Sequence, residues 1–412
     1  MNENPPNLAD AAWLKNPAVR AVFAVLEDAG EEVRVVGGAV RNALMDLPVA
    51  DVDFATTAPP GRVSAVAEAA GMKAVPTGFE HGTVTLVVDG RGFEVTTLRE
   101  DVATDGRRAV VRFGRDWVAD ARRRDFTVNA LSVDSTGAVH DPIGGLADIV
   151  ARRIRFIGDP DLRIAEDRLR ILRLFRFHAE YGDGEIDAAG LSAATRARGG
   201  LRNLSAERIG QEMRRLVMAS RAAETVALMQ EGGILGLVLG GVGYVTPFAR
   251  LVRFEMAMGM KPSVARRLAV LGCRIDEDVL RVGARLRLSN AERDRIAGTL
   301  SAARSLWPIP DQRTARRILH AQGVEAYRNG VSYAHAVNGG SEAAWGDLLL
   351  LPERWAIPKF PLGGRDIVGG GIRGPAVGEL LRALEAWWIE QDFRPDETAL
   401  RVRLQQMIAS AQ

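Results

Sequence analysis

The stretch that decides the fold is "VVGGAVRNALMDLPVADVDFAT", residues 35–56. A β-branched run leads into Gly37 and Gly38, a helix-forming segment follows, and Asp51 and Asp53 open a second β-branched run. This order of strand, glycine turn, helix and strand is typical of a mixed α/β unit. Side chains at i and i+2 of a strand share one face, so the two aspartates are expected to present their carboxylates side by side.

Two adjacent carboxylates repel each other unless a cation or a proton neutralises them. Oxygen ligands without His or Cys nearby select Mg²⁺, or Mn²⁺ as an alternative, so Asp51 and Asp53 are the candidate catalytic and metal-binding residues. Gly37 and Gly38 let backbone amides approach an anion closely, and Arg41 adds a positive charge. A DxD pair alone is usually a pair of surface residues, and two glycines alone usually form a plain tight turn. Together they are typical of a nucleotidyl-transfer site.

A second candidate motif is "ARRRDFTVNAL", residues 121–131. A lone run of this kind is usually a solvated charge cluster, but here it enters an apolar stretch expected to be buried. Arg124 is therefore a candidate for binding a triphosphate. Asp125 is a candidate acceptor for a ribose hydroxyl.

A third motif is "LRIAEDRLRILRLFRFHAEYG", residues 162–182, which predicts one amphipathic helix over 161–181. The common interpretation is a helix stabilised by an ion pair between Glu166 and Arg170. The functional interpretation is base selection. An acceptor at Asp167 beside a donor at Arg170 matches the amino group and ring nitrogen that cytosine and adenine share, and opposes guanine and uracil.

Composition is that of an ordinary globular protein, with 412 residues, 47% hydrophobic and 26% charged. No apolar run reaches the length of a membrane span, and no signal peptide is apparent at the start. The single cysteine, Cys273, excludes an intrachain disulfide and a thiolate zinc site. The five histidines are scattered. These features favour the reducing cytoplasm and no membrane partner.

The arginines indicate the kind of partner. Lysine occurs four times among the 54 cationic residues, which is typical of a GC-rich genome, but composition does not explain where arginine clusters. Residues 107–124 hold seven arginines against two aspartates, and residues 152–176 hold eight against four acids. Local basic patches on a chain of net charge +2 point to an anionic partner such as a nucleotide or nucleic acid.

The secondary-structure pattern changes near residue 150. The first part alternates helix and strand signals and predicts a mixed sheet of about five strands. Two of them form a β-hairpin around "DGRG", residues 89–92, and one lies within 125–142. Beyond this part helical periodicity dominates. We therefore expect an α+β protein with a catalytic head at 1–150.

The motifs, in this order, resemble the class II CCA tRNA nucleotidyltransferase and bacterial poly(A) polymerase family. The matching segments span about 35–220 and are "VVGGAVRN…DVDFAT", "EVTTLR", "RRDFTVNAL", "EDRLRILRLFRF" and "LSAERIGQEMRRL". The resemblance implies a polymerase-β-like head followed by an elongated all-α part. This part would comprise a neck at 151–245, which selects the base and binds RNA, and a body and tail at 246–412, which bind tRNA. Magnesium is expected at Asp51 and Asp53. The resemblance also implies nucleotide contacts at Gly38, Arg41, Arg124, Asp167, Arg170, Arg173 and Arg176.

The resemblance further implies template-independent addition of CCA to the tRNA 3′ end, with one site for CTP and ATP. Segment 99–121 corresponds to a flexible loop tied to the switch from C to A addition. Ala50 departs from the family, which often has Lys there. The nearest alternative is a poly(A) polymerase. A second alternative is a non-catalytic RNA-binding protein, which the intact Asp51/Asp53 pair disfavours. A third is a small-molecule nucleotidyltransferase, which the long basic helical region disfavours. No protein partner is inferred.

Overall fold

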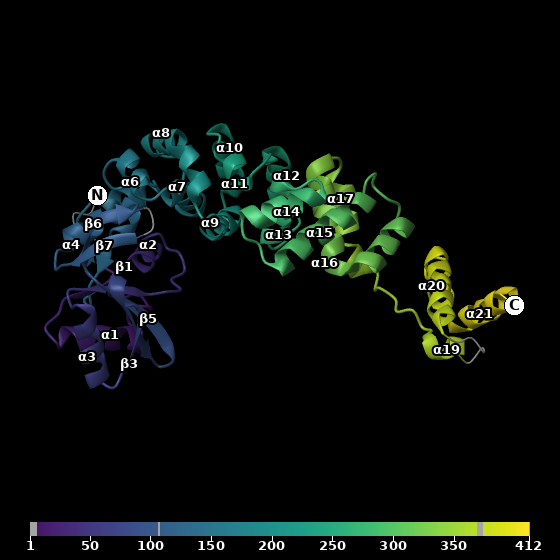
Figure 1. Ribbon diagram of the computed structural model, residues 1–412, viewed down its shortest axis with the longest axis horizontal. Coiled ribbons are helices and arrows are strands. Elements are labelled where there is room, and N and C mark those ends of the chain that lie inside the picture. Colours follow the sequence, from purple (N-terminus) through teal and green to yellow (C-terminus); the bar gives the residue numbers. More distant parts are fainter. Residues whose placement is uncertain (1–5, 106–107, 369–373, 412) are drawn as a thin grey trace. The chain divides into compact units, whose positions relative to one another are not determined.

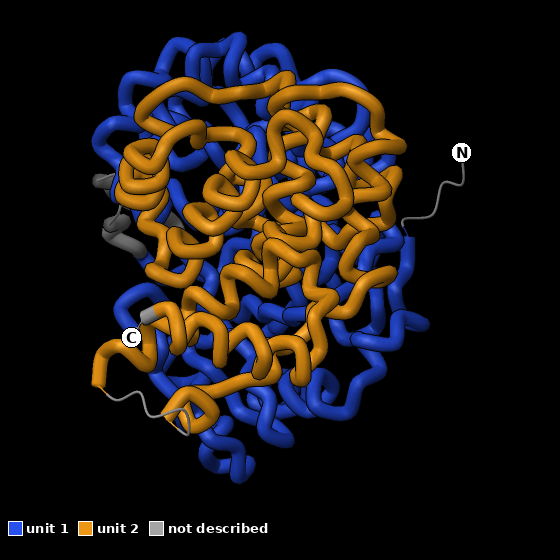
Figure 2. Tube along the Cα trace, turned by 90° about the vertical axis from the view of Figure 1, so that its right-hand side faces the viewer, with its two compact units in different colours: residues 1–238 blue, residues 239–412 orange. Residues whose placement is uncertain are grey.

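The computed structural model describes residues 6–105, 108–368 and 374–411. The chain divides into two compact units, Met1–Val238 and Leu239–Gln412, which Figure 2 shows in different colours. The division into head, neck, and body with tail stays a prediction, although the second unit begins close to the expected boundary at residue 246.

A seven-stranded mixed sheet forms the core of the first unit, in the order β3-β4-β5-β2-β1-β8-β9. Strands β2 and β5 pair in parallel, and the other neighbours in this sheet are antiparallel. The strands are β1 (Val33–Val36), β2 (Asp53–Thr56), β3 (Lys73–Gly78), β4 (Thr83–Val88), β5 (Arg91–Thr97), β8 (Ser132–Val133) and β9 (Val139–His140).

The predicted count of about five strands was low for two physical reasons. Segment 125–142 was predicted to hold one strand but forms two, β8 and β9; each is two residues long, too short to show the alternation that identifies a strand. Strand β3 contains Pro76 and has no buried residue, so its sequence lacks a strand signal. The mixed character of the sheet is confirmed.

The predicted β-hairpin around "DGRG" is confirmed. Strands β4 and β5 pair up to Val88 and Arg91, which leaves a two-residue turn. Both turn residues have positive φ, 51° at Asp89 and 75° at Gly90. Asp-Gly is the sequence that such a turn favours. The hairpin places Glu94 next to the start of β2, since Phe54 pairs with Val95.

Two helices pack against this sheet, α1 (Pro17–Glu27) and α3 (Pro60–Ala69), as Figure 1 shows. Phe23 of α1 meets Phe54 of β2 edge to face at 5.2 Å. This packing fixes the position of β2, the strand that begins at Asp53. The other helices of this unit are α2 (Gly38–Leu44), α4 (Trp117–Arg122), α5 (Gly145–Val150), α6 (Pro160–Glu166), α7 (Leu169–Tyr181), α8 (Ala188–Ala197), α9 (Ala206–Met218) and α10 (Ala222–Glu231).

The segment predicted to be a flexible loop, 99–121, contains regular structure. Strands β6 (Arg99–Asp105) and β7 (Arg108–Phe113) form a separate two-stranded sheet, and α4 begins at Trp117. Asp116 caps α4 by accepting hydrogen bonds from the amides of Val118 and Ala119.

The single helix predicted over 161–181 is wrong. Helix α6 ends at Glu166, Asp167 has extended backbone angles (φ −149°, ψ 111°), and α7 begins at Leu169. The carboxylate of Asp167 accepts a hydrogen bond from the amide of Leu169, an alternative to helical bonding that aspartate favours. Periodicity missed the break because the apolar stripe continues across it.

Helices make up the described part of the second unit, as the loss of strand signals predicted. In Figure 1 they run from green to yellow. They are α12 (Val245–Ala257), α13 (Val264–Gly272), α14 (Asp276–Arg285), α15 (Asn290–Ser305), α16 (Gln312–Asn338), α17 (Glu342–Leu349), α18 (Leu351–Arg354), α19 (Gly364–Val368), α20 (Pro375–Glu390) and α21 (Glu397–Ala411), while α11 (Leu235–Leu239) spans the division between the units.

A buried ion pair lies in the core of the helices before the tail. Both oxygens of Glu255 on α12 are paired, one with Arg266 at 2.7 Å and the other with Arg267 at 2.8 Å. All three residues are at most 5% exposed. A buried carboxylate with both oxygens bonded is an arrangement in which removal of one partner is strongly destabilising.

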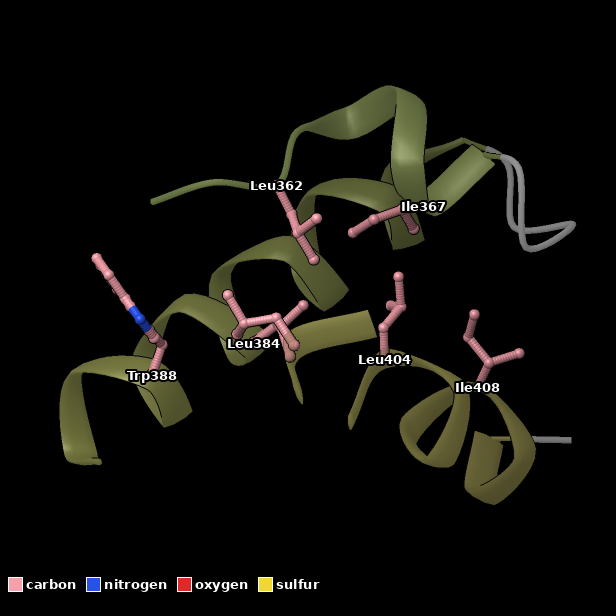
Figure 3. Packing of buried hydrophobic residues seen from close by; sticks show 7 residues of the cluster. Leu362, Ile367, Leu384, Trp388, Leu404 and Ile408 are labelled. Carbon is pink, nitrogen blue, oxygen red and sulfur yellow. The ribbon is translucent and has the colours of Figure 1, made fainter. Parts of the chain in front are cut away.

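Helices α19, α20 and α21 share a small hydrophobic core of their own, shown in Figure 3. Leu384 and Trp388 of α20 pack with Leu404 and Ile408 of α21, and Ile367 of α19 completes the group. Trp388 also donates a hydrogen bond to the carbonyl of Pro395 at 3.0 Å, which fixes the turn between α20 and α21. No helix among the described residues is long and apolar enough to span a membrane.

Shortening a side chain in this small core should loosen the C-terminal helices. Leu384 is fully buried, and a leucine-to-alanine change in a core costs about 2–5 kcal/mol. We expect Leu384→Ala to speed hydrogen–deuterium exchange across α20 and α21, measured by mass spectrometry. Val402→Ala on the exposed side of α21 is the matched control, since Val402 is 55% exposed. Equal exchange in both variants would contradict this packing.

Candidate active site

A cavity of about 900 Å³ lies within the first unit. Its walls come from the glycine turn before α2, the residues around the start of β2, the RRD turn after α4, and helices α7 and α9. All the candidate site residues identified in the sequence line this cavity. They are Gly37, Gly38, Arg41, Asp51, Asp53, Arg124, Asp125, Asp167, Arg170, Arg173 and Arg176.

The two candidate metal ligands lie at the start of β2. Asp53 is its first residue, and Asp51 precedes the strand, whereas the sequence had placed both residues on it. Partial desolvation and the negative charges of Glu94 and Asp51 raise the pKa of Asp53 above its usual value, and Arg124 opposes this only in part. The carboxylates thus lie close enough to repel each other.

This donor set fits Mg²⁺. Among the described residues no group of three His, Cys, Asp or Glu side chains forms a complete metal site. Mg²⁺ is commonly bound by one or two carboxylates together with substrate phosphates and water, and Asp51 and Asp53 supply that number. A divalent cation would also relieve the repulsion that raises the pKa of Asp53.

The glycine turn brings the backbone against two guanidinium groups. Gly37 has φ 70° and ψ −125°, a conformation that is strained for residues other than glycine. A Cβ built on Gly37 would lie 3.5 Å from Nη1 of Arg124, and one on Gly38 would lie 3.7 Å from Nη2 of Arg41. The turn therefore leaves space beside both arginines.

Arg41 is buried and its orientation is fixed. Its Nη1 donates to Oδ1 of Asn129 at 2.7 Å, and its Nη2 donates to Oδ1 of Asn42 at 2.8 Å. The guanidinium carbon lies 3.8 Å from the centre of the Tyr181 ring, a cation–π geometry. Desolvation lowers the pKa of Arg41, although an arginine in such a site stays charged.

A buried aspartate, Asp120 of α4, holds the arginines of the RRD turn. Its oxygens pair with Arg123 at 2.7 Å and with Arg124 at 3.1 Å. Burial alone would raise the pKa of Asp120, but the two arginines outweigh it and hold the pKa below its usual value. Arg124 is thus directed along the cavity wall before any ligand arrives.

Asp125, the third residue of that motif, is almost completely buried and already bonded. Oδ1 accepts from the amide of Phe126 and from Nδ2 of Asn129, both at 2.9 Å, and Oδ2 pairs with Arg173 at 2.5 Å. Burial would raise the pKa of Asp125, but Arg173 and these hydrogen bonds lower it. Its contact with a ribose stays a prediction, and the geometry favours a role in holding Arg173.

The candidate base-selecting residues face the cavity from the break between α6 and α7. Asp167 pairs through Oδ2 with Arg208 of α9 at 2.6 Å. Arg170 pairs with Glu166 and donates to the carbonyl of Arg163 at 2.8 Å. The ion pair of the common interpretation therefore exists, and it holds Arg170 in the cavity wall.

Arg176 is only 1% exposed and bonds to two acidic residues. Its Nε donates to Glu212 of α9 at 2.5 Å, and its Nη1 donates to Glu180 at 2.7 Å. The bond to Glu212 fastens α7 to α9, whereas Glu180 lies on α7 itself. A direct nucleotide contact by Arg176 stays a prediction.

Several cavity residues were not among the candidates. Arg208 and Arg215 of α9 line the wall, and so do Asn129 and Tyr181. Arg208, Glu212 and Arg215 recur at i, i+4 and i+7, so they share one face of α9. That helical spacing was the available signal, but it could not show that this face meets α7.

The charge of the cavity suits a polyanion. Nine arginines and four aspartates line it, counted over the described residues. The aspartates divide into two kinds: Asp125 and Asp167 are paired with arginine, whereas Asp51 and Asp53 are the carboxylates at β2. An arginine-rich wall beside one carboxylate pair can bind a triphosphate and a divalent cation together.

Comparison with known proteins agrees with this geometry. Residues 33–155 match the model of the "Poly A polymerase head domain", and residues 185–241 match the "Probable RNA and SrmB- binding site of polymerase A". CCA tRNA nucleotidyltransferase 1, mitochondrial, of Mus musculus is 32% identical over 387 residues, covering 90% of this chain and 85% of its own length. The CCA-adding enzyme of Limosilactobacillus fermentum is 30% identical over 396 residues, covering 92% and 94%.

Solved structures show the same fold. The crystal structure of the Bacillus stearothermophilus CCA-adding enzyme in complex with CTP has a TM-score of 0.76 and 27% identity, covering 96% of this chain and 98% of that one. The Thermotoga maritima CCA-adding enzyme complexed with tRNA has a TM-score of 0.73 at 20% identity, covering 99% of each chain.

The polymerase-β-like head and its arginine-lined cavity thus define a nucleotidyltransferase. More closely, the chain belongs to the class II CCA tRNA nucleotidyltransferase and bacterial poly(A) polymerase family.

A side chain at Gly37 should disturb the cavity. Because its backbone angles are strained for alanine, Gly37→Ala should cost about 1–3 kcal/mol of stability. It should also raise the KM for nucleotide, since the added methyl group lies beside Arg124. Gly61→Ala in α3 is the control: Gly61 is helical, and nothing lies within 4 Å of its Cβ position. Thermal unfolding and steady-state kinetics measure both, and equal behaviour of the two variants would show that the turn does not need glycine at position 37.

Proposed function

We propose that this protein adds CCA to the 3′ end of tRNA without a nucleic-acid template, using CTP and ATP. The observation that carries the proposal is a cavity that joins a carboxylate pair, Asp51 and Asp53, to an acceptor–donor pair, Asp167 and Arg170. The first pair is suited to nucleotidyl transfer and the second to choosing a base. Relatives named CCA-adding enzymes over most of the chain support the substrate.

The reaction joins the tRNA 3′-oxygen to the α-phosphorus of the nucleotide and breaks the bond to pyrophosphate. Arg41 and Arg124, which line the cavity, would bind the triphosphate and fix its direction, and Gly37 and Gly38 would give it room. Positioning and charge stabilisation provide most of the catalysis in phosphoryl transfer. The arginines are held by Asn129 and Asp120, so little reorganisation accompanies substrate binding.

Asp51 and Asp53 would hold magnesium, with manganese as an alternative. When bound, the divalent cations would activate the 3′-hydroxyl and stabilise the charge on the leaving oxygens. The two carboxylates come from the start of β2, whereas the base-selecting residues come from the break between α6 and α7. Separate elements of the fold therefore serve the reacting phosphate and the base.

Base selection follows from hydrogen-bond polarity. The carboxylate of Asp167 accepts, and the guanidinium of Arg170 donates. Cytosine and adenine each present an amino donor next to a ring-nitrogen acceptor, whereas uracil and guanine present a carbonyl and a ring N–H. One pair of protein groups can therefore accept CTP and ATP and reject UTP and GTP.

The helical second unit would bind the tRNA backbone, as expected for a partner that is larger than the cavity. A cytoplasmic location is part of this proposal. It rests on a single cysteine, Cys273, which is buried; burial raises the pKa of its thiol to about 12, so it is unreactive.

A nucleotide-incorporation assay tests the activity. Full-length protein given tRNA that lacks its 3′ CCA, with labelled CTP and ATP, should add three nucleotides and stop, as read on a sequencing gel. Substrates lacking CC, C or A separate the successive steps. Long A tails on arbitrary RNA would replace this proposal with a poly(A) polymerase, and the absence of incorporation would indicate a non-catalytic protein.

Asp51→Asn and Asp53→Asn should each lower kcat by at least about a thousandfold, because each removes a carboxylate charge without changing side-chain size. Asp46→Asn is the matched control. Asp46 lies outside the cavity with φ 57°, a conformation that asparagine tolerates, so activity should be retained. Magnesium titration of each variant separates loss of metal affinity from misfolding. Full activity in either cavity variant would disprove the metal assignment.

A further inference from the structure

The base-selecting aspartate is held by a residue that the base-selection scheme does not include. Asp167 lies at the break between α6 and α7, and Arg208 lies in the first turn of α9, 41 residues further along the chain. Nη2 of Arg208 donates to Oδ2 of Asp167 at 2.6 Å. Both side chains line the cavity and are about a quarter exposed, at 26% and 25%.

This ion pair determines how Asp167 can bond. Oδ1 accepts from the amide of Leu169 at 3.0 Å, and Oδ2 accepts from Arg208. The arginine side chain has only hydrogen-bond donors, so Oδ2 of Asp167 must be the acceptor in this contact. Each carboxylate oxygen has about two acceptor sites, so the group can still receive an amino hydrogen from a base. With both oxygens bonded, the plane of the carboxylate is also fixed.

Arg208 is itself placed by the packing of α9 on α7. One turn further along α9, Glu212 accepts from the buried Arg176 of α7 at 2.5 Å. The start of α9 is capped by Ser205, which accepts from the amide of Arg208. These contacts fix α9 on both sides of Arg208 and so hold Arg208 in position.

We propose that Arg208 is a positioning residue that sets nucleotide specificity by keeping Asp167 an oriented hydrogen-bond acceptor. The proposal rests on the base-selecting role of Asp167 in the proposed function. Without Arg208, the carboxylate keeps only its bond to Leu169 and can turn. A carboxylate that turns no longer presents a fixed acceptor to the amino group of cytosine, so the site discriminates less well against uracil, which presents a carbonyl at that position.

The expected signature is a change in discrimination rather than in activity alone. Arg208→Gln should lower the ratio of kcat/KM for CTP to that for UTP by about tenfold or more, as expected for loss of a bond between charged groups. Arg208→Lys keeps the charge and should keep most of the ratio. Because Arg208 is a quarter exposed, neither change opens a cavity in the core.

Arg215 supplies the matched control. It lies on the same face of α9 and lines the same cavity, but it pairs with Glu180 at 3.2 Å instead of Asp167. Arg215→Gln removes the same charge from the same wall. We expect it to change the KM for all nucleotides similarly and to leave the ratio of CTP to UTP unchanged.

The experiment measures CTP and UTP incorporation by the full-length protein into tRNA lacking its 3′ CCA. The proteins compared are the wild type, the three arginine variants, Asp167→Ala, and the double variant that combines Asp167→Ala with Arg208→Gln. If Arg208 acts through Asp167, the double variant should discriminate no worse than Asp167→Ala alone. Circular dichroism and thermal unfolding of each variant verify folding.

Three results would overturn the inference. An unchanged ratio in Arg208→Gln, or equal losses in Arg208→Gln and Arg215→Gln, would mean that Arg208 only adds charge to the cavity. Retained discrimination in Asp167→Ala would overturn the base-selecting role and this inference with it, whereas CCA addition by the wild type would still stand. If Asp167→Ala loses the discrimination between CTP and UTP but Arg208→Gln keeps it, only the role of Arg208 is refuted.

Discussion

The structure of the site depends on one chain of hydrogen bonds that begins at the buried carboxylate of Asp125. Asp125 bonds to Arg173 of α7 on one side and to Asn129 on the other, and Asn129 accepts from Arg41 of α2. Removing one partner of a buried ion pair typically costs about 3–5 kcal/mol, because a charge is left uncompensated. This chain therefore ties the glycine turn and its arginine to α7, the helix that carries Arg170, which is proposed to help select the base.

The same principle explains how so many arginines share one wall. Like charges this close repel, and several are largely withdrawn from water, which disfavours them further. Each of the central ones has an acidic or amide partner: Asp120 for Arg124, Glu166 for Arg170, and Glu212 for Arg176. These partners fix the directions of the donors, so the wall is prepared for a polyanion before one binds.

Local patterns predicted much of the fold. The Asp-Gly turn and its flanking alternation defined the β4–β5 hairpin, and helical periodicity correctly described the second unit. Errors arose where the local signal is weak. Strands β8 and β9 are too short for periodicity, β3 contains a proline, and the helix break at Asp167 depends on a side chain bonding to the backbone. Helix propensity did not show that the side chain of Asp167 bonds to the backbone amide of Leu169 and ends the helix there.

The sequence by itself determined the chemistry: a glycine turn, a carboxylate pair, an arginine-rich motif and an Asp/Arg pair, in residue types suited to nucleotide and metal. Only the tertiary structure decided which partners these residues have. Arg208 reaches Asp167 from a helix 41 residues away, and Asp125 turned out to be bonded to Arg173. The physical reason is that periodicity reports the face on which a residue lies, whereas an ion pair depends on which two faces pack together.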